Sequence, residues 1–177
     1  MLGLTPNDEV NSLFAREARD DFDVPATFAA INTLSKGMTP ALLRKQGSHM
    51  LFDGPTDVER WNVRFRHGIA RFDRFHWVGA PESAAEPGEA DAERARGVNE
   101  ADPFVILMLR RSGRWDLMHA DLTPRMGDVA VIAIHEAEVN EAYTELARLG
   151  WAPGEEAEAE AEAAAADEAE TIAESAG

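Results

Sequence analysis

The sequence contains no cysteine, which excludes disulfide bonds, thiolate zinc ligands and cysteine nucleophiles. Long apolar runs are also missing. The two longest, 104–109 and 129–134, have six residues each, whereas a helix that crosses a bilayer needs about 20. We therefore expect no membrane-spanning helix in these 177 residues. Residues 1–4 contain neither a base nor a long apolar stretch, so we do not expect a signal peptide.

Several sequence motifs for cofactors and catalysis are absent. No G-x-G occurs, although dinucleotide-binding α/β domains need such a loop so that backbone N–H groups can approach the pyrophosphate. No G-x-S-x-G nucleophile elbow occurs either. The histidines show no metal-binding spacing; they are His49, His67, His76, His119 and His135. We therefore predict a protein that is not an enzyme, with no catalytic residue, no metal site and no cofactor bound by this chain alone.

Basic residues are scarce relative to acidic ones. The chain has 17 Lys and Arg against 33 Asp and Glu, which gives a net charge of −16. Residues 1–80 are neutral overall, whereas 81–102 carry a net charge of −5 and 154–177 a net charge of −9. Acidic surfaces repel phosphate groups, so we do not expect nucleic acid as a partner.

The two acidic segments divide the chain into four parts. Residues 1–80 are predicted to form an α/β unit, and 103–153 a small α+β module. Residues 81–102 contain several prolines and glycines and are typical of a flexible acidic linker. Residues 154–177 are almost entirely Glu and Ala, with little apolar surface to bury, so we expect a disordered or partly helical acidic tail.

Residues 1–80 alternate between short apolar segments and amphipathic ones. Strands are predicted at 2–4, 26–31 and 49–52. Helices are predicted to begin at the capping residues Thr5, Thr39 and Thr56. This alternation is typical of parallel α/β units. A further strand is predicted at 69–78.

The second ordered segment shows a different order of elements. Strands are predicted at 104–109, 115–119 and 129–134, and a helix at 136–149. Gly150 is a suitable helix stop, and Trp151 is placed to fold back onto that helix.

One group of polar residues has the position of a binding site. Thr5, Asn7, Asp8 and Asn11 follow the carboxyl end of the first predicted strand, where open α/β sheets place their ligands. They are therefore candidate ligand-binding residues. The alternative is structural: Thr5 and Asp8 would cap the helix, and Asn11 would bond a loop.

Two sets of sequence strings resemble known modules. Leu-Thr-Pro-Asn-Asp-Glu-Val-Asn at 4–11, Val-Pro-Ala-Thr-Phe-Ala-Ala-Ile-Asn at 24–32 and Leu-Leu-Arg-Lys-Gln-Gly at 42–47 resemble the second half of a TrkA-N (RCK) domain. The strings at 104–111 and 122–134, with the turn Gly127-Asp128, resemble a TrkA-C module. In this order they are most similar to the cytosolic C-terminal region of an NhaP-type cation:proton antiporter.

The resemblance implies a fold and a function. The fold would be α/β: a partial Rossmann-like parallel sheet, then a TrkA-C-like α+β module and the disordered tail. The function would be that of a cytosolic, non-catalytic regulatory region of a monovalent cation transport system, a sodium or potassium/proton antiporter or a potassium uptake system. It would act by ligand or ion sensing and by subunit contacts, and NAD or ATP would bind only if the missing glycine-rich half were supplied.

The resemblance also implies partners and a location. The partner would be a membrane cation transporter, fused or separate, and the chain would lie at the cytoplasmic face of the membrane. A half-sheet leaves its edge strand at 2–4 without a neighbour, so we expect a homo-oligomer that is favoured by high salt. Two alternatives stay open: a fragment of an NAD-dependent Rossmann enzyme, or a plain oligomerisation module.

Overall fold

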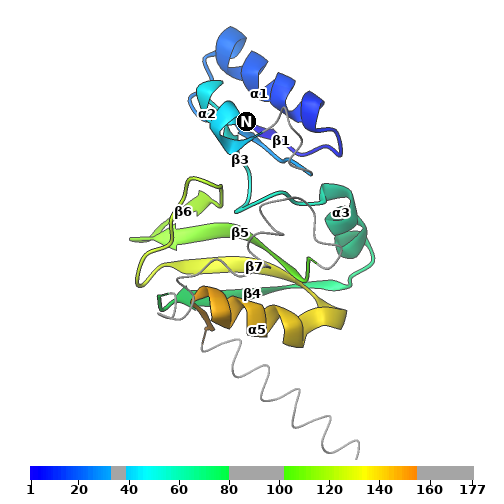
Figure 1. Ribbon diagram of the computed structural model, residues 1–177, viewed down its shortest axis with the longest axis vertical. Helices are drawn as coiled ribbons and strands as arrows, with labels where there is room; N and C mark the ends of the chain where they lie inside the picture. Colours follow the sequence, from blue (N-terminus) through cyan, green and yellow to red (C-terminus); the bar gives the residue numbers. More distant parts are fainter. Residues whose placement is uncertain (33–38, 80–101, 155–177) are drawn as a thin grey trace, which may run out of the picture.

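Two sheets lie one above the other along the long axis of the molecule (Figure 1). The computed structural model describes residues 1–32, 39–79 and 102–154. The first sheet is parallel with strand order β1-β2-β3, and the second is antiparallel with strand order β6-β5-β7-β4-β8. The mixed α/β class is therefore confirmed. The predicted linker and tail lie outside the described residues, apart from Asp102 and Gly154.

The elements follow in chain order. They are β1 (Leu2–Gly3), α1 (Asp8–Phe22), β2 (Phe28–Ala29), α2 (Pro40–Lys45), β3 (His49–Met50), α3 (Val58–Arg66), β4 (Ala70–Trp77), β5 (Phe104–Arg111), β6 (Arg114–Leu117), β7 (Val129–His135), η2 (Glu136–Glu138), α5 (Val139–Leu149) and β8 (Trp151–Pro153).

The parallel sheet has the predicted strand–helix–strand order. Leu2 lies opposite Phe28, and Phe28 opposite His49. A small cluster of buried side chains joins α1 and α2 to the strands; it comprises Ala15, Ala29, Ile31, Leu43 and Met50. Among the described strands, only β2 pairs with β1, so β1 is an edge strand.

The helix starts were only partly predicted. Thr39 caps α2 as expected, and its side chain accepts from the N–H of Leu42. However, α1 is capped by Asn7 and α3 by Asp57, so the predictions of Thr5 and Thr56 were wrong. The Thr5 hydroxyl instead donates to Asn11 Oδ1, and the Thr56 hydroxyl donates to the Gly54 carbonyl.

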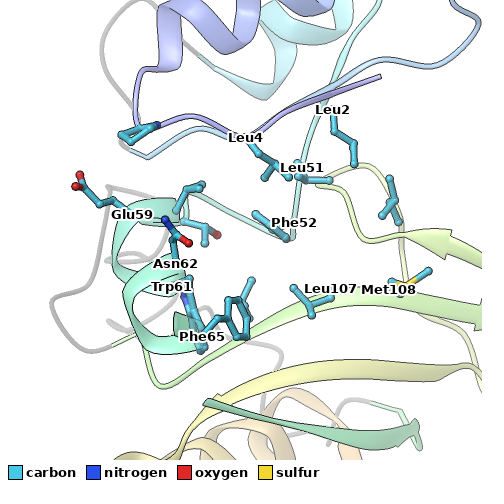
Figure 2. Close-up of a pocket in the computed structure, with 15 residues that line it drawn as sticks. Leu2, Leu4, Leu51, Phe52, Glu59, Trp61, Asn62, Phe65, Leu107 and Met108 are labelled. Atoms are coloured by element: carbon cyan, nitrogen blue, oxygen red, sulfur yellow. The ribbon is translucent and has the colours of Figure 1, made fainter. Parts of the chain in front are cut away.

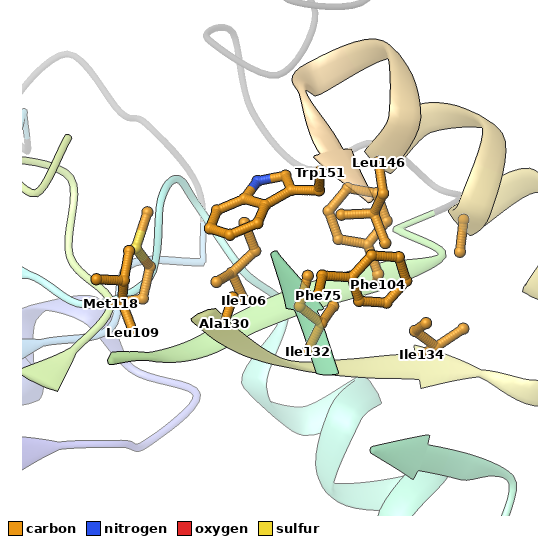
Figure 3. Close-up of a cluster of buried hydrophobic side chains, with 11 residues drawn as sticks. Phe75, Phe104, Ile106, Leu109, Met118, Ala130, Ile132, Ile134, Leu146 and Trp151 are labelled. Atoms are coloured by element: carbon orange, nitrogen blue, oxygen red, sulfur yellow. The ribbon is translucent and has the colours of Figure 1, made fainter. Parts of the chain in front are cut away.

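The antiparallel sheet is covered on both faces. Its main core combines α5 with alternate side chains of β4, β5 and β7, as Figure 3 shows for Phe75, Ile132 and Leu146. On the other face, Trp61 of α3 packs against Val105 and Ala133. Because both faces are buried, residues 104–109 of β5 and 129–134 of β7 are uninterrupted apolar runs rather than alternating ones.

Strand β4 joins the second sheet, although the sequence placed it with residues 1–80. It pairs with β7 from Ala70↔His135 to His76↔Val129. A strand after Gly150 was not predicted: β8 pairs with the other edge of β4, so Trp151 lies opposite Trp77. The Gly150 helix stop is confirmed, with φ at +97°. The antiparallel sheet therefore takes strands from both predicted segments.

Both described ends of the predicted acidic segments belong to the folded part. Asp102 is buried, and its carbonyl accepts from Arg64 Nη1 at 2.6 Å. The N–H of Gly154 donates to the Arg74 carbonyl at 2.8 Å. The predicted linker and the predicted tail therefore each include one residue, Asp102 and Gly154 respectively, that belongs to the folded part.

Candidate functional site

The predicted polar residues form a hydrogen-bonded turn between β1 and α1. Asn11 is completely buried. Its Oδ1 accepts from the N–H of Thr5 at 2.8 Å and from the Thr5 hydroxyl at 2.7 Å. Its Nδ2 donates to the carbonyls of Thr5 at 2.8 Å and Ala30 at 2.9 Å. The side chain of Asn11 therefore fastens the turn to the end of β2.

Asp8 reaches a residue that sequence reasoning missed. Its Oδ1 accepts from the backbone N–H of Asn32 at 2.8 Å and from Asn32 Nδ2 at 2.6 Å. The Oδ1 of Asn32 in turn accepts from the N–H of Val58 at 3.1 Å. This chain of bonds connects the starts of α1 and α3. The only sequence signal was that Asn32 directly follows an apolar segment.

The structure thus brings Thr5, Asn7, Asp8 and Asn11 together, as predicted. Asn7 Oδ1 caps α1 through the N–H of Val10 at 3.0 Å. These contacts are those expected of a structural turn. Ligand binding by the four residues stays a prediction.

An apolar cleft lies between the edge of the parallel sheet and the antiparallel sheet. Figure 2 shows Leu2 and Leu4 on one side, Trp61 and Phe65 of α3 on another, and Leu107 and Met108 of β5 on a third. Its volume is about 620 Å³. Glu59 and Asn62 contribute polar side chains. Sequence reasoning did not predict it, because its walls come from segments about 100 residues apart.

Two histidines and an aspartate meet where the sheets join. The N–H of Phe52 donates to the Met118 carbonyl and that of Ala120 to the Met50 carbonyl, which places 118–120 beside the end of β3. His49 Nδ1 lies 2.9 Å from Asp121 Oδ2, and His119 Nδ1 lies 4.0 Å from the same oxygen.

The environment of this cluster is partly apolar. The two imidazole centroids are 4.7 Å apart, and the ring of Phe28 lies 5.6 and 5.8 Å from them. Burial, and then the neighbouring His49, lowers the pKa of His119, which favours a neutral imidazole. Arg44 Nη1 donates to Asp121 Oδ1 at 2.8 Å. The prediction of no metal site rested on spacing, which does not reveal a partner 70 residues away.

The turn before β7 is held by a buried carboxylate. Asp128 accepts from Arg111 Nε at 3.0 Å and Nη2 at 2.6 Å, and from the N–H of Arg125 at 2.8 Å. The Arg111 guanidinium holds the pKa of Asp128 below its usual range, although burial opposes this. Gly127 adopts φ of +84° in this turn, a conformation that favours glycine.

Two arginines beside aromatic residues form contacts within the protein. Arg64 is buried, stacks 4.6 Å from the Trp61 ring centroid and lies 3.5 Å from Glu138. Arg71 pairs with Asp73 at 2.7 Å and donates to the Tyr143 hydroxyl at 2.9 Å. Both side chains therefore contribute to packing.

The comparisons with known proteins give no identification. No protein-family model, no curated protein and no solved structure matches this chain. Within 1–32, 39–79 and 102–154, no helix combines the length and apolar character needed to cross a membrane. The resemblance to TrkA-N and TrkA-C modules, and the location at the cytoplasmic face, therefore stay predictions.

Proposed function

We propose that this chain is a non-catalytic regulatory region of a monovalent cation transport system, a sodium or potassium/proton antiporter or a potassium uptake system, at the cytoplasmic face of the membrane. The parallel sheet would be the second half of a Rossmann-like TrkA-N domain, and the antiparallel sheet a TrkA-C-like module. The sequence strings that carry the resemblance support this. The structural observation that supports it best is the edge of β1 beside the apolar cleft, where no other described strand than β2 pairs with β1.

The edge and the cleft have the properties of a subunit contact. Leu2 and Leu4 are 43% and 46% exposed, and both line the cleft. An unpaired strand edge and an apolar groove each recruit a partner surface. We propose that a second copy of the chain covers them. Regulation would then follow if the assembly has two packings and the transporter or a ligand favours one of them.

Self-association should depend on these two leucines. The double variant Leu2→Glu/Leu4→Glu should weaken association of the full chain by about 10- to 100-fold, because covering the exposed part of each leucine contributes about 0.7–1.4 kcal/mol. Sedimentation velocity at low and high salt measures this. Phe22→Glu is the matched control, because Phe22 is 77% exposed and does not line the cleft. A monomeric parent chain at both salt concentrations would contradict the proposal.

The transport role can be measured directly. Deleting the coding segment for residues 1–177 from the source genome should change sodium- or potassium-dependent proton exchange, or potassium uptake, by about fivefold, the low end of typical coupling between sites. Everted membrane vesicles with a pH-sensitive dye report exchange, and rubidium uptake by cells reports potassium import.

Complementation separates the possible functions. The parent segment and the Phe22→Glu variant should restore transport, whereas Leu2→Glu/Leu4→Glu should not. Unchanged transport after deletion would overturn the proposal. If association persisted in that case, a plain oligomerisation module would be favoured. Micromolar binding of NAD in calorimetry would instead favour the fragment of an NAD-dependent enzyme.

A further inference from the structure

Three side chains with metal-binding atoms converge where the two sheets meet. His49 belongs to β3, and His119 and Asp121 follow β6. One nitrogen or oxygen atom of each residue lies within 4.8 Å of the corresponding atoms of the other two. The backbone on both sides is held in place, since residues 50–52 and 118–120 exchange N–H···O=C hydrogen bonds.

We propose that His49, His119 and Asp121 bind one divalent transition-metal ion of the Zn²⁺ class. Two imidazoles and one carboxylate suit zinc, cobalt or nickel, whereas magnesium and calcium prefer sets of oxygen ligands. Three protein ligands leave a fourth position, which a water molecule would occupy. This inference goes beyond the proposed regulatory function and does not depend on it.

The distances require only small side-chain movements. Zinc ligands lie about 2.0–2.2 Å from the metal, so ligand atoms in a tetrahedral site are about 3.3–3.6 Å apart. The separations from Asp121 Oδ2 are 2.9 Å to His49 Nδ1 and 4.0 Å to His119 Nδ1, which bracket that range. Metal binding would replace the 3.3 Å hydrogen bond from the Asp121 N–H to His119 Nδ1 if this nitrogen became the ligand.

The surroundings orient the ligands. Arg44 binds Asp121 Oδ1 at 2.8 Å and leaves Oδ2, which faces His49, for the metal. Hydrogen bonds of this kind commonly position a ligating carboxylate. The side chains of His119 and Asp121 are each 18% exposed and that of His49 is 40% exposed, so a metal ion has access from solvent. A bound ion would tie β3 to the segment after β6.

Metal titration of the full chain tests this site. Zn²⁺ binding is measured by competition with a chromophoric chelator, and Co²⁺ reports geometry through the visible bands of a four-coordinate complex. We expect one equivalent of Zn²⁺ per chain, a four-coordinate Co²⁺ spectrum and a higher melting temperature with Zn²⁺. His49→Gln and His119→Gln should each weaken Zn²⁺ binding by at least about tenfold.

Control variants and ions make the test specific. His67→Gln alters an exposed histidine outside the cluster and should leave Zn²⁺ affinity unchanged. Mg²⁺ should leave the melting temperature of the parent chain unchanged. Melting curves recorded without metal show whether each variant folds. If a histidine variant does not fold, Asp121→Asn provides an independent variant of the same site. Equal Zn²⁺ affinity in the parent and the cluster variants, or a six-coordinate Co²⁺ spectrum, would overturn the proposal.

Discussion

Replacing Phe75 with alanine should lower the free energy of unfolding by about 3–5 kcal/mol, the usual cost of removing a buried phenylalanine side chain. Phe75 is 0% exposed in the core between the antiparallel sheet and α5 (Figure 3). Its ring meets Tyr143 edge-on, with centroids 5.1 Å apart. The cavity left by the substitution would lie against strands that are paired on both sides, which limits its collapse.

Phe72 provides the matched control on the same strand. It points to the opposite face of β4 and is 60% exposed, so Phe72→Ala should cost less than about 1 kcal/mol. Urea denaturation followed by tryptophan fluorescence measures both variants, and similar slopes would allow direct comparison of midpoints. Equal losses for the two variants would contradict the assignment of the core to the α5 face.

Changing Asn11 to aspartate should destabilise the protein by about 3 kcal/mol or more, the cost of an uncompensated buried charge. The Nδ2 of Asn11 donates to two carbonyls, and a carboxylate cannot donate. The variant would therefore place a negative charge beside the carbonyl oxygens of Thr5 and Ala30. The loss should shrink at acidic pH, because a protonated carboxyl group can donate again.

Asn140→Asp makes the same chemical change at an exposed position in the first turn of α5. A negative charge there is neutral or slightly stabilising, by about 0.3–1 kcal/mol. Thermal and urea unfolding between pH 4 and 8 distinguish the two variants. If Asn11→Asp cost no more than Asn140→Asp, the network would not be structural, and the four polar residues would become stronger ligand-binding candidates.

The sequence by itself determined features that depend on neighbours along the chain. The alternation of short apolar and amphipathic segments was enough to predict the parallel sheet, because crossover helices follow directly on their strands. Thr39 as a helix cap and Gly150 as a helix stop were predicted for the same reason, since the groups that they satisfy lie within a few residues. The grouping of Thr5, Asn7, Asp8 and Asn11 is likewise local.

Only the tertiary structure decided the features that join distant segments. The membership of β4 depends on β7, about 60 residues further along, because Phe75 is buried in the core that β4, β5 and β7 form with α5. Local propensity carries no information on such pairing. The hydroxyl of Thr5 donates to the buried Oδ1 of Asn11 and does not cap α1. Asn11 is held in that position by its bond to the Ala30 carbonyl, 19 residues further along the chain. The meeting of His49 with Asp121, 72 residues apart, follows from the junction of the two sheets, which no spacing along the chain encodes.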